Sequence, residues 1–181
     1  MVLLPCGMTE KPQQDSALDQ IRRADENQFN IQIAADGRWF HDGGEIRRKA
    51  LVKLFASVLK RDPVGVFWLE TPVEKGRIEV ADAPFIATRL IVQNVGKAMT
   101  TAYPTFGLVT NVDDEVPLDA AHPIQMLPSP DGGGRRPYIE VRDGLLAKLS
   151  RPVYYELASH AVTDQDGRMG VWSHNQFFTL E

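Results

Sequence analysis

The segment Thr71-Pro72-Val73-Glu74-Lys75, with Arg77 just beyond it, carries charges of both signs in a stretch rich in turn-forming residues. Lys75 and Arg77 could hold a phosphate group, because ammonium and guanidinium groups donate charge-assisted hydrogen bonds to phosphate oxygens. Glu74 could at the same time orient a sugar or a base. The alternative is an ordinary solvated hairpin loop. Both interpretations stay open, although loops carry function more often than cores do.

Two arginines and an aspartate are further candidates for a ligand site. Asp82 precedes Ala83-Pro84-Phe85, where it could bind a ligand or cap a turn before the proline, and the turn is the favoured interpretation. Arg47 and Arg142 occupy matched positions in two similar segments, Glu45–Leu54 and Glu140–Leu149. They could form a cationic site across a junction between related halves. The favoured alternative is that each lies on its own surface and contributes little.

Trp172 is the aromatic candidate. An exposed indole could stack on a base, which contributes about 1–3 kcal/mol. Aromatic side chains on strands more often pack in a core or between halves. The same choice applies to the other aromatic residues of the expected strands, Trp39, Trp68, Tyr138 and Tyr155.

No residue pattern in the sequence is typical of a catalytic site. Four scattered histidines and one cysteine lack the spacing of zinc ligands. Ser173 and His174 are neighbours in an expected strand, so their side chains should point to opposite faces and form no nucleophile–base pair. The stretch Gly132–Arg136 lacks the Lys-Ser/Thr of a phosphate-binding loop and is interpreted as a flexible hairpin tip. The sequence therefore predicts no cofactor and no metal site, and it favours a non-catalytic protein over an enzyme.

Composition excludes several classes of protein. The chain has 181 residues, 43% hydrophobic and 24% charged, with a net charge of −4. An acidic balance argues against nucleic-acid binding. No apolar run approaches the roughly 20 residues that span a bilayer. One cysteine leaves no internal disulfide and fits a reducing compartment, so we expect a cytoplasmic location.

The periodicity of apolar residues predicts an α+β chain in two halves. The best-defined element is a helix that begins at Asp42 as N-cap, with Glu45 completing a capping box, and ends at Lys60-Arg61 before Pro63. Strands are expected before it, and a hairpin of 64–71 with 77–82 after it. A second, short helix is expected over Asp143–Leu149, followed by strands over 153–162 and 169–180.

The two similar segments favour an ancestral duplication. Glu45–Leu54 and Glu140–Leu149 share Glu, Arg, Leu, Lys and Leu at matching positions, and similar strand signals surround both. Aligning the turns Asp42-Gly43 and Asp143-Gly144 instead gives a different register, which the sequence leaves open. The predicted units are a tail with a short helix (1–29, the helix over 15–24), a first α+β repeat (30–95) and a second (96–181).

Several motifs together resemble the bacterial domain-of-unknown-function family numbered 1285. They are Thr71-Pro72…Glu74-Lys75, Val80…Asp82…Pro84-Phe85 and Gly170-Val171-Trp172-Ser173. The resemblance implies two related halves, the C-terminal one similar to a pleckstrin-homology fold. It also implies a ligand site at their interface suited to a nucleotide-like molecule, and a role in signalling. His174-Asn175 departs from the small residues expected there, which puts a shared role of that loop in doubt.

These observations predict a non-catalytic module that binds a small anionic, nucleotide-like ligand between its halves, with a protein partner to read the signal. The ligand-binding candidates are Arg47, Thr71, Glu74, Lys75, Arg77, Asp82, Arg142 and Trp172. A hydrolase or transferase using Glu74 or Asp82 as base is the first alternative. An interaction module without a small ligand is the second, and it predicts an exposed apolar patch and no cleft.

Overall fold

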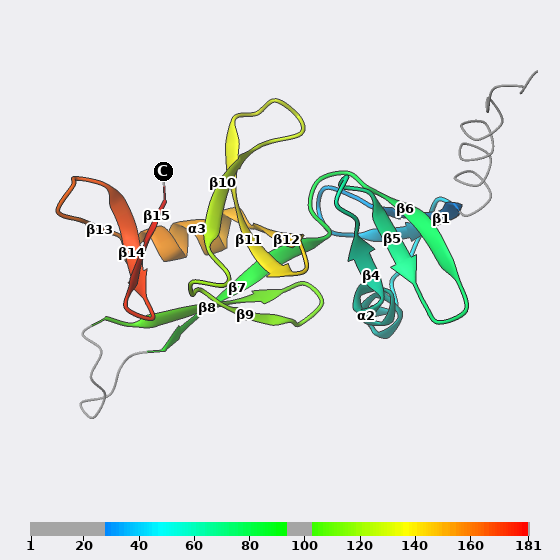
Figure 1. Ribbon diagram of the computed structural model, residues 1–181, viewed down its shortest axis with the longest axis horizontal. Helices are drawn as coiled ribbons and strands as arrows, with labels where there is room; N and C mark the ends of the chain where they lie inside the picture. The colour runs from blue at the N-terminus through cyan, green and yellow to red at the C-terminus, as the bar shows by residue number, and fades with distance from the viewer. Residues whose placement is uncertain (1–27, 94–102, 181) are drawn as a thin grey trace, which may run out of the picture.

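A computed structural model of the chain describes residues 28–93 and 103–180. The expected tail and the short helix over 15–24 lie outside these residues. Figure 1 shows two halves side by side along the long axis of the molecule. No helix in the described ranges is long and apolar enough to span a membrane.

The N-terminal half is one six-stranded sheet with a helix, α2 (Lys49–Ser57). Its strand order is β3-β2-β1-β6-β5-β4, and only the central β1–β6 pair is parallel. Two antiparallel three-stranded units are therefore joined along one parallel seam. The strands are β1 (Gln28–Ile33), β2 (Trp39–His41), β3 (Gly44–Glu45), β4 (Leu59–Arg61), β5 (Phe67–Glu70) and β6 (Lys75–Val80).

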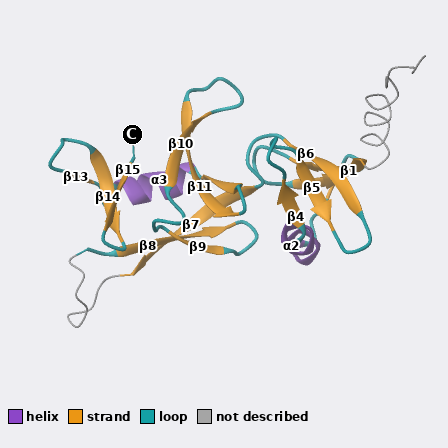
Figure 2. Cartoon of the chain, in the orientation of Figure 1, coloured by secondary structure: helices purple, strands orange, loops and turns teal. Residues whose placement is uncertain are grey.

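The C-terminal half has a second six-stranded sheet, a three-stranded sheet and the helix α3 (Arg151–Ala158) (Figure 2). The larger sheet runs β10-β11-β12-β7-β8-β9, again with one parallel pair, β12–β7. The smaller sheet is β13-β14-β15. The strands are β7 (Phe85–Gln93), β8 (Thr105–Thr110), β9 (Glu115–Pro117), β10 (Ile124–Pro128), β11 (Arg135–Arg142), β12 (Leu145–Leu149), β13 (Val162–Thr163), β14 (Met169–Ser173) and β15 (Gln176–Thr179).

The predicted α+β class with two related halves is confirmed. Each half contains three strands, a helix and three more strands: β1-β2-β3-α2-β4-β5-β6 and β10-β11-β12-α3-β13-β14-β15. The turns that follow β4 and β13 also contain equivalent hydrogen bonds. Asp62 Oδ1 accepts the backbone N–H groups two and four residues ahead, and Asp164 Oδ1 does the same. The pleckstrin-like character of the second half stays a prediction.

This element order favours the register that aligns Asp42-Gly43 with Asp143-Gly144. The alignment of Glu45–Leu54 with Glu140–Leu149 is wrong, because it places the helix α2 on the strand β12. The shared letters in those two segments therefore do not record equivalent positions.

The second predicted helix, over Asp143–Leu149, is also wrong. Asp143 and Gly144 both have positive φ (46° and 73°) and form the tight turn between β11 and β12, as Asp-Gly pairs do in two-residue hairpins. The alternating burial of β12 fits a strand. The helix comes next, with Pro152 in its first turn, where proline is favoured because its missing N–H is not needed. Residues 153–158, predicted as strand, are therefore helical.

The first helix was predicted in the right region with the wrong ends. Asp42 is not an N-cap: it has φ 49° and forms the β2–β3 turn with Gly43. Glu45 ends β3, and α2 begins at Lys49. Lys60 and Arg61 lie in β4 beyond the helix. The predicted hairpin after it is confirmed as β5 and β6.

The two sheets divide between β6 and β7, whereas the sequence-based interpretation ended the first half at residue 95. The reason is that β7 pairs with β8 and β12 and with no strand of the first sheet. Phe85 and Ala87, at its beginning, are fully buried. We call residues 28–83 and 84–180 the two halves, and the contact between them the seam.

Candidate functional site

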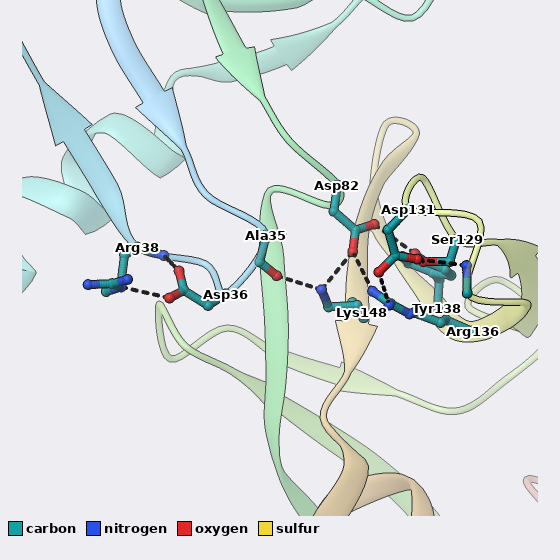
Figure 3. Close-up of polar contacts among 10 residues, drawn as sticks. Ala35, Asp36, Arg38, Asp82, Ser129, Asp131, Arg136, Tyr138 and Lys148 are labelled. Atoms are coloured by element: carbon teal, nitrogen blue, oxygen red, sulfur yellow. Dashed lines mark hydrogen bonds and ion pairs between the residues drawn. The ribbon is translucent and has the colours of Figure 1, made fainter. Parts of the chain in front are cut away.

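Asp82 lies in the connection from β6 to β7, and its side chain is only 4% exposed. Its carboxylate accepts hydrogen bonds from the Tyr138 hydroxyl (2.7 Å) and from Lys148 Nζ (2.6 Å) (Figure 3). A buried carboxylate is stable only when cations or donors compensate the loss of water. Asp82 therefore acts as the acceptor at the centre of a polar cluster on the seam.

Lys148 connects this cluster to the N-terminal half. It lies in β12, and its ammonium also donates to the backbone carbonyl of Ala35 in the turn between β1 and β2. Its side chain is 14% exposed. One ammonium group thus binds the inter-half connection and the first half at the same time.

Arg136, in β11, is the second cation near Asp82, at 3.7 Å. It also pairs with Asp131, which accepts hydrogen bonds from the Ser129 hydroxyl (2.6 Å) and the Gly133 N–H (2.9 Å). The Ser129 hydrogen bond, the Gly133 N–H and Arg136 lower the pKa of Asp131 to about 2. Burial, and then Asp82, raise the pKa of the Tyr138 phenol well above its usual range. Asp131 is therefore ionised and Tyr138 neutral near neutral pH.

A second group of contacts holds the seam beside α2. Arg142 donates to Asp114 (2.6 Å) and to the Ala56 carbonyl (2.9 Å), with its guanidinium 5.2 Å from the Phe85 ring. Lys49 and Lys53 of α2 both reach Asp113 in the β8–β9 turn. Two further bonds cross the seam, from the Asn111 side chain to the Gly37 carbonyl (3.1 Å) and from Arg61 to the Gly144 carbonyl (3.2 Å), so the halves are fixed at several separate places.

A cavity of about 460 Å³ opens beside the first cluster, on the C-terminal half. This volume is within the range of small-molecule sites. Of the residues that line it, none is Asp or Glu, while four are cationic. We call it the cation cavity, and the lining side chains that matter here are Arg135, Arg136, Lys148, Arg151, Tyr154 and Tyr155.

The cations of the cavity come from different elements. Arg135 donates to the Met126 carbonyl on the neighbouring strand β10, and Arg151 begins α3. No carboxylate of the described residues lies within salt-bridge distance of Arg135 or Arg151, in contrast to Arg136 and Lys148. Arg135 and Arg151 therefore keep positive charge that the described protein does not neutralise.

The cavity lies beside the seam, and the hollows within the seam are less suited to an anion. One, next to Asp82 and Tyr138, has a volume of about 160 Å³, below that of most small-molecule sites. Another, of about 360 Å³, lies beside Arg142, whose guanidinium Asp114 already occupies. The cation cavity is the best candidate site.

Comparison with known families supplies the identity. The model described as "Domain of unknown function (DUF1285), N-terminal domain" matches residues 18–83. The model described as "Protein of unknown function (DUF1285), C-terminal domain" matches residues 84–180. The chain belongs to the DUF1285 family. The boundary between the two models coincides with the boundary between the two sheets.

Two crystal structures of DUF1285 family proteins are similar to the chain. One, from Silicibacter pomeroyi, is 38% identical, with a TM-score of 0.75, over 84% of this chain and 80% of that one. The other, from Shewanella baltica, is 25% identical, with a TM-score of 0.51, over 72% of this chain and 91% of that one. No curated protein matches the chain.

The predicted loop of this DUF1285 protein lies away from the cation cavity. Thr71 and Glu74 bind each other across the β5–β6 turn. The Thr71 hydroxyl accepts a hydrogen bond from the Glu74 N–H and donates one to the Glu74 carbonyl. Lys75 pairs with Glu70 (3.2 Å) and lies over the Trp68 ring. Arg77 is exposed on β6. The structure does not bring these residues together with Asp82.

The remaining candidates of the DUF1285 chain are also dispersed. Arg47 is 88% exposed and lies 3.7 Å from Glu45, so it does not face Arg142 across the seam. Arg142 does reach the seam, but as a structural cation. Trp172 stacks on Tyr103, with ring centroids 5.1 Å apart. Asp82 alone of the predicted residues touches a cation that lines the cavity.

The expectation that the side chains of Ser173 and His174 point to opposite faces is wrong. Ser173 ends β14, and His174 has φ 47° in the following turn, so the imidazole folds back and Nδ1 lies 3.1 Å from Ser173 Oγ. The serine is fully buried, and its oxygen accepts the Phe106 N–H. His174 Nδ1 also lies 3.1 Å from the Leu118 carbonyl. The pair therefore fixes a loop and presents no nucleophile to solvent.

Asp131 of the DUF1285 protein should give a measurable pH dependence. Its pKa falls from 3.8 to about 2 on folding, so it stabilises the fold above about pH 4 and loses this contribution as the pH falls towards 2. Asp131 is 60% exposed, so solvent screens its contacts. Asp131→Asn should therefore lower the melting temperature only by about one to two degrees at about pH 7, and the difference from wild type should shrink at about pH 2.5. Thermal melts across this range test it.

Asp166→Asn, in the exposed pair with Arg168, is the control and should change the melting temperature little at any pH. A wild-type advantage over Asp131→Asn that stays constant down to about pH 2.5 would contradict the assigned titration.

Proposed function

We propose that this DUF1285 protein is a non-catalytic module that binds a small phosphate-bearing, nucleotide-like ligand in the cation cavity, as a sensor in cytoplasmic signal transduction. A protein partner would read the occupied state. The observation that carries the proposal is the charge of the cavity lining, which has four cations and no acidic side chain among the described residues. Arg135 and Arg151 are the groups that would contact the phosphate first.

The chemistry of these two side chains suits phosphate. A guanidinium is planar and permanently charged, and it can donate two parallel hydrogen bonds to phosphate oxygens. Arg135 is oriented by the Met126 carbonyl, and Arg151 is exposed at the start of α3. A ligand would therefore meet one guanidinium that is already positioned, which lowers the entropy lost on binding.

Tyr155 provides a surface for an aromatic base. Its side chain is on α3 and is 67% exposed, although it lines the cavity. A ring with one open face can stack on a base, which contributes about 1–3 kcal/mol. Tyr154 is more buried, and its hydroxyl donates to the Leu180 carbonyl (2.6 Å). Tyr155 is thus the better stacking residue.

The described residues give less support to catalysis. Both oxygens of Asp82 are engaged by Tyr138 and Lys148, so this carboxylate is poorly placed to remove a proton from a substrate. Glu74 is exposed in a turn remote from the cavity. Neither of the proposed bases lines the cation cavity.

Isothermal titration of the purified chain with adenosine 5′-monophosphate, pyrophosphate and adenosine tests the proposal. We expect both phosphate compounds to bind and adenosine to bind far more weakly. The double substitution Arg135→Gln/Arg151→Gln should weaken the binding of both phosphate compounds by about a hundredfold or more, because each lost charge-assisted contact contributes about 1.5 kcal/mol or more. Arg47→Gln, at an exposed arginine outside the cavity, is the control.

Tyr155→Ala separates the base from the phosphate. It should weaken adenosine 5′-monophosphate by about fivefold or more and leave pyrophosphate unchanged. Absence of binding by every phosphate compound, in a chain with native circular dichroism, would count against the proposed function. Loss of binding in Arg47→Gln alone would move the site away from the cavity.

A further inference from the structure

Two cations belong both to the cavity wall and to the seam. Lys148 and Arg136 line the cation cavity, and each also contacts Asp82, at 2.6 and 3.7 Å. Figure 3 shows Lys148 between the Asp82 carboxylate and the Ala35 carbonyl of the first half. An anion in the cavity would therefore act on the same charges that hold the seam.

We propose, on the basis of the proposed function, that a phosphate-bearing ligand in the cavity competes with Asp82 for Lys148 and Arg136 and so loosens the contact between the halves at this point. A phosphate close to Lys148 and Arg136 shares these cations with Asp82 and repels its carboxylate, so it weakens the pairing of Asp82 with them. Asp82 is buried, so its pairing is strong but depends on these cations. A ligand phosphate weakens that pairing from the opposite side.

The groups that face the two cations limit how far the change extends. On the seam side they are Asp82, the Tyr138 hydroxyl and the Ala35 carbonyl; on the loop side, Asp131 pairs with Arg136. When Lys148 turns towards the ligand, the β1–β2 turn loses its bond to the C-terminal half at Ala35. The same turn keeps the bond from the Asn111 side chain to the Gly37 carbonyl (3.1 Å), and the contacts of α2 with the β8–β9 turn also stay. The movement is therefore a local opening and not a separation of the halves.

Thermodynamic linkage gives the coupling a sign that can be measured. If the ligand weakens the Asp82 contact, removal of the Asp82 charge must strengthen ligand binding by the same factor. A purely structural role of Asp82 predicts the opposite, because loss of the buried pair would disorder Lys148 and weaken the site.

The first experiment measures pyrophosphate and adenosine 5′-monophosphate affinity by titration calorimetry in wild type and in Asp82→Asn. Asparagine keeps the shape and an acceptor for Tyr138 but removes the charge. We expect Asp82→Asn to bind both compounds about tenfold more tightly. Asp166→Asn, in the exposed pair with Arg168, is outside both the cavity and the seam and should bind them as wild type does. An unchanged or weaker affinity in Asp82→Asn overturns the coupling.

Hydrogen exchange in the wild-type protein provides a second test that does not depend on any variant. The Gly37 N–H is bonded to the Ala34 carbonyl in the turn that Lys148 holds. Saturating adenosine 5′-monophosphate should speed exchange in segment 34–38 severalfold, and equal or slower exchange overturns the coupling. The two proposals fail differently: no binding to wild type removes both, whereas binding that requires Arg135 and Arg151 but ignores Asp82 removes only the coupling.

Discussion

Replacement of Lys148 by methionine should lower the free energy of unfolding by about 3–5 kcal/mol, measured by urea denaturation at neutral pH. Methionine keeps most of the length of the side chain but removes the charge. The Asp82 carboxylate, 4% exposed, is then left with the Tyr138 hydroxyl and the more distant Arg136. An uncompensated buried charge is far more costly than the loss of the attraction itself. Asp82→Asn should cost less, because Lys148 keeps the Ala35 carbonyl as an acceptor and the single amide oxygen of asparagine accepts from Tyr138.

The double variant Asp82→Asn/Lys148→Met distinguishes this explanation from a loss of packing. With both charges gone, nothing charged is left buried without its partner, so the double variant should be more stable than the sum of the two single losses predicts. The exposed pair of Asp36 and Arg38 is the reference, and Asp36→Asn should cost less than about 1 kcal/mol. Strict additivity of the two seam substitutions would show that Asp82 and Lys148 do not interact energetically.

The seam cluster also shows what sequence reasoning could reach. Asp82 was a candidate because an aspartate before a proline was expected to be either a turn cap or a ligand. Its partners Lys148 and Tyr138 come from β12 and β11, more than fifty residues away. Only the order and register of the strands bring these residues next to Asp82, and the sequence alone does not give that register. Lys148 was further hidden because β12 was interpreted as a helix.

The secondary-structure errors have one physical origin. Asp-Gly precedes both α2 and β12, and an aspartate followed by apolar residues is an N-cap signal as well as a hairpin signal. After Asp143 the apolar residues Leu145, Leu146, Ala147 and Leu149 form a short run without a clear period. Those after Asp42 continue at helical spacing as far as Leu59, so the length of the run is the signal that distinguishes strand from helix. Pro152 was interpreted as the end of the helix predicted over Asp143–Leu149, although proline is also favoured in the first turn of a helix.

The cation cavity was missed for a different reason. Arg135 and Arg136 belong to the glycine-rich stretch Gly132–Arg136. The sequence predicts no phosphate-binding loop there, because the stretch lacks the Lys-Ser/Thr pair and no helix is expected after it. The structure places both at the start of β11, after a hairpin that Asp131 fixes, and adds Arg151 and Tyr155 from α3. Sites built by tertiary packing from separate segments leave no local spacing signal, unlike motifs in one loop.

Trp39 places both a large ring and a polar N–H group in the core of the first half. It is 1% exposed, and its ring lies 6.3 Å from that of Phe55 in a stacked arrangement. The indole N–H is buried, and no described residue accepts its hydrogen bond. Trp39→Ala should cost about 3–5 kcal/mol, because the cavity left by a large aromatic residue collapses only in part.

Trp39→Phe should cost much less than the lost volume alone implies. Phenylalanine leaves a smaller cavity and also removes a donor whose burial without a partner is unfavourable by about 1–3 kcal/mol. The two terms oppose each other, so the net change in the free energy of unfolding should lie within about 1 kcal/mol of zero. Urea denaturation of both variants, with the half-exposed Leu54→Ala of α2 as reference, gives the comparison. If Trp39→Phe is nearly as damaging as Trp39→Ala, the indole N–H has a partner in solution and contributes to stability instead of opposing it.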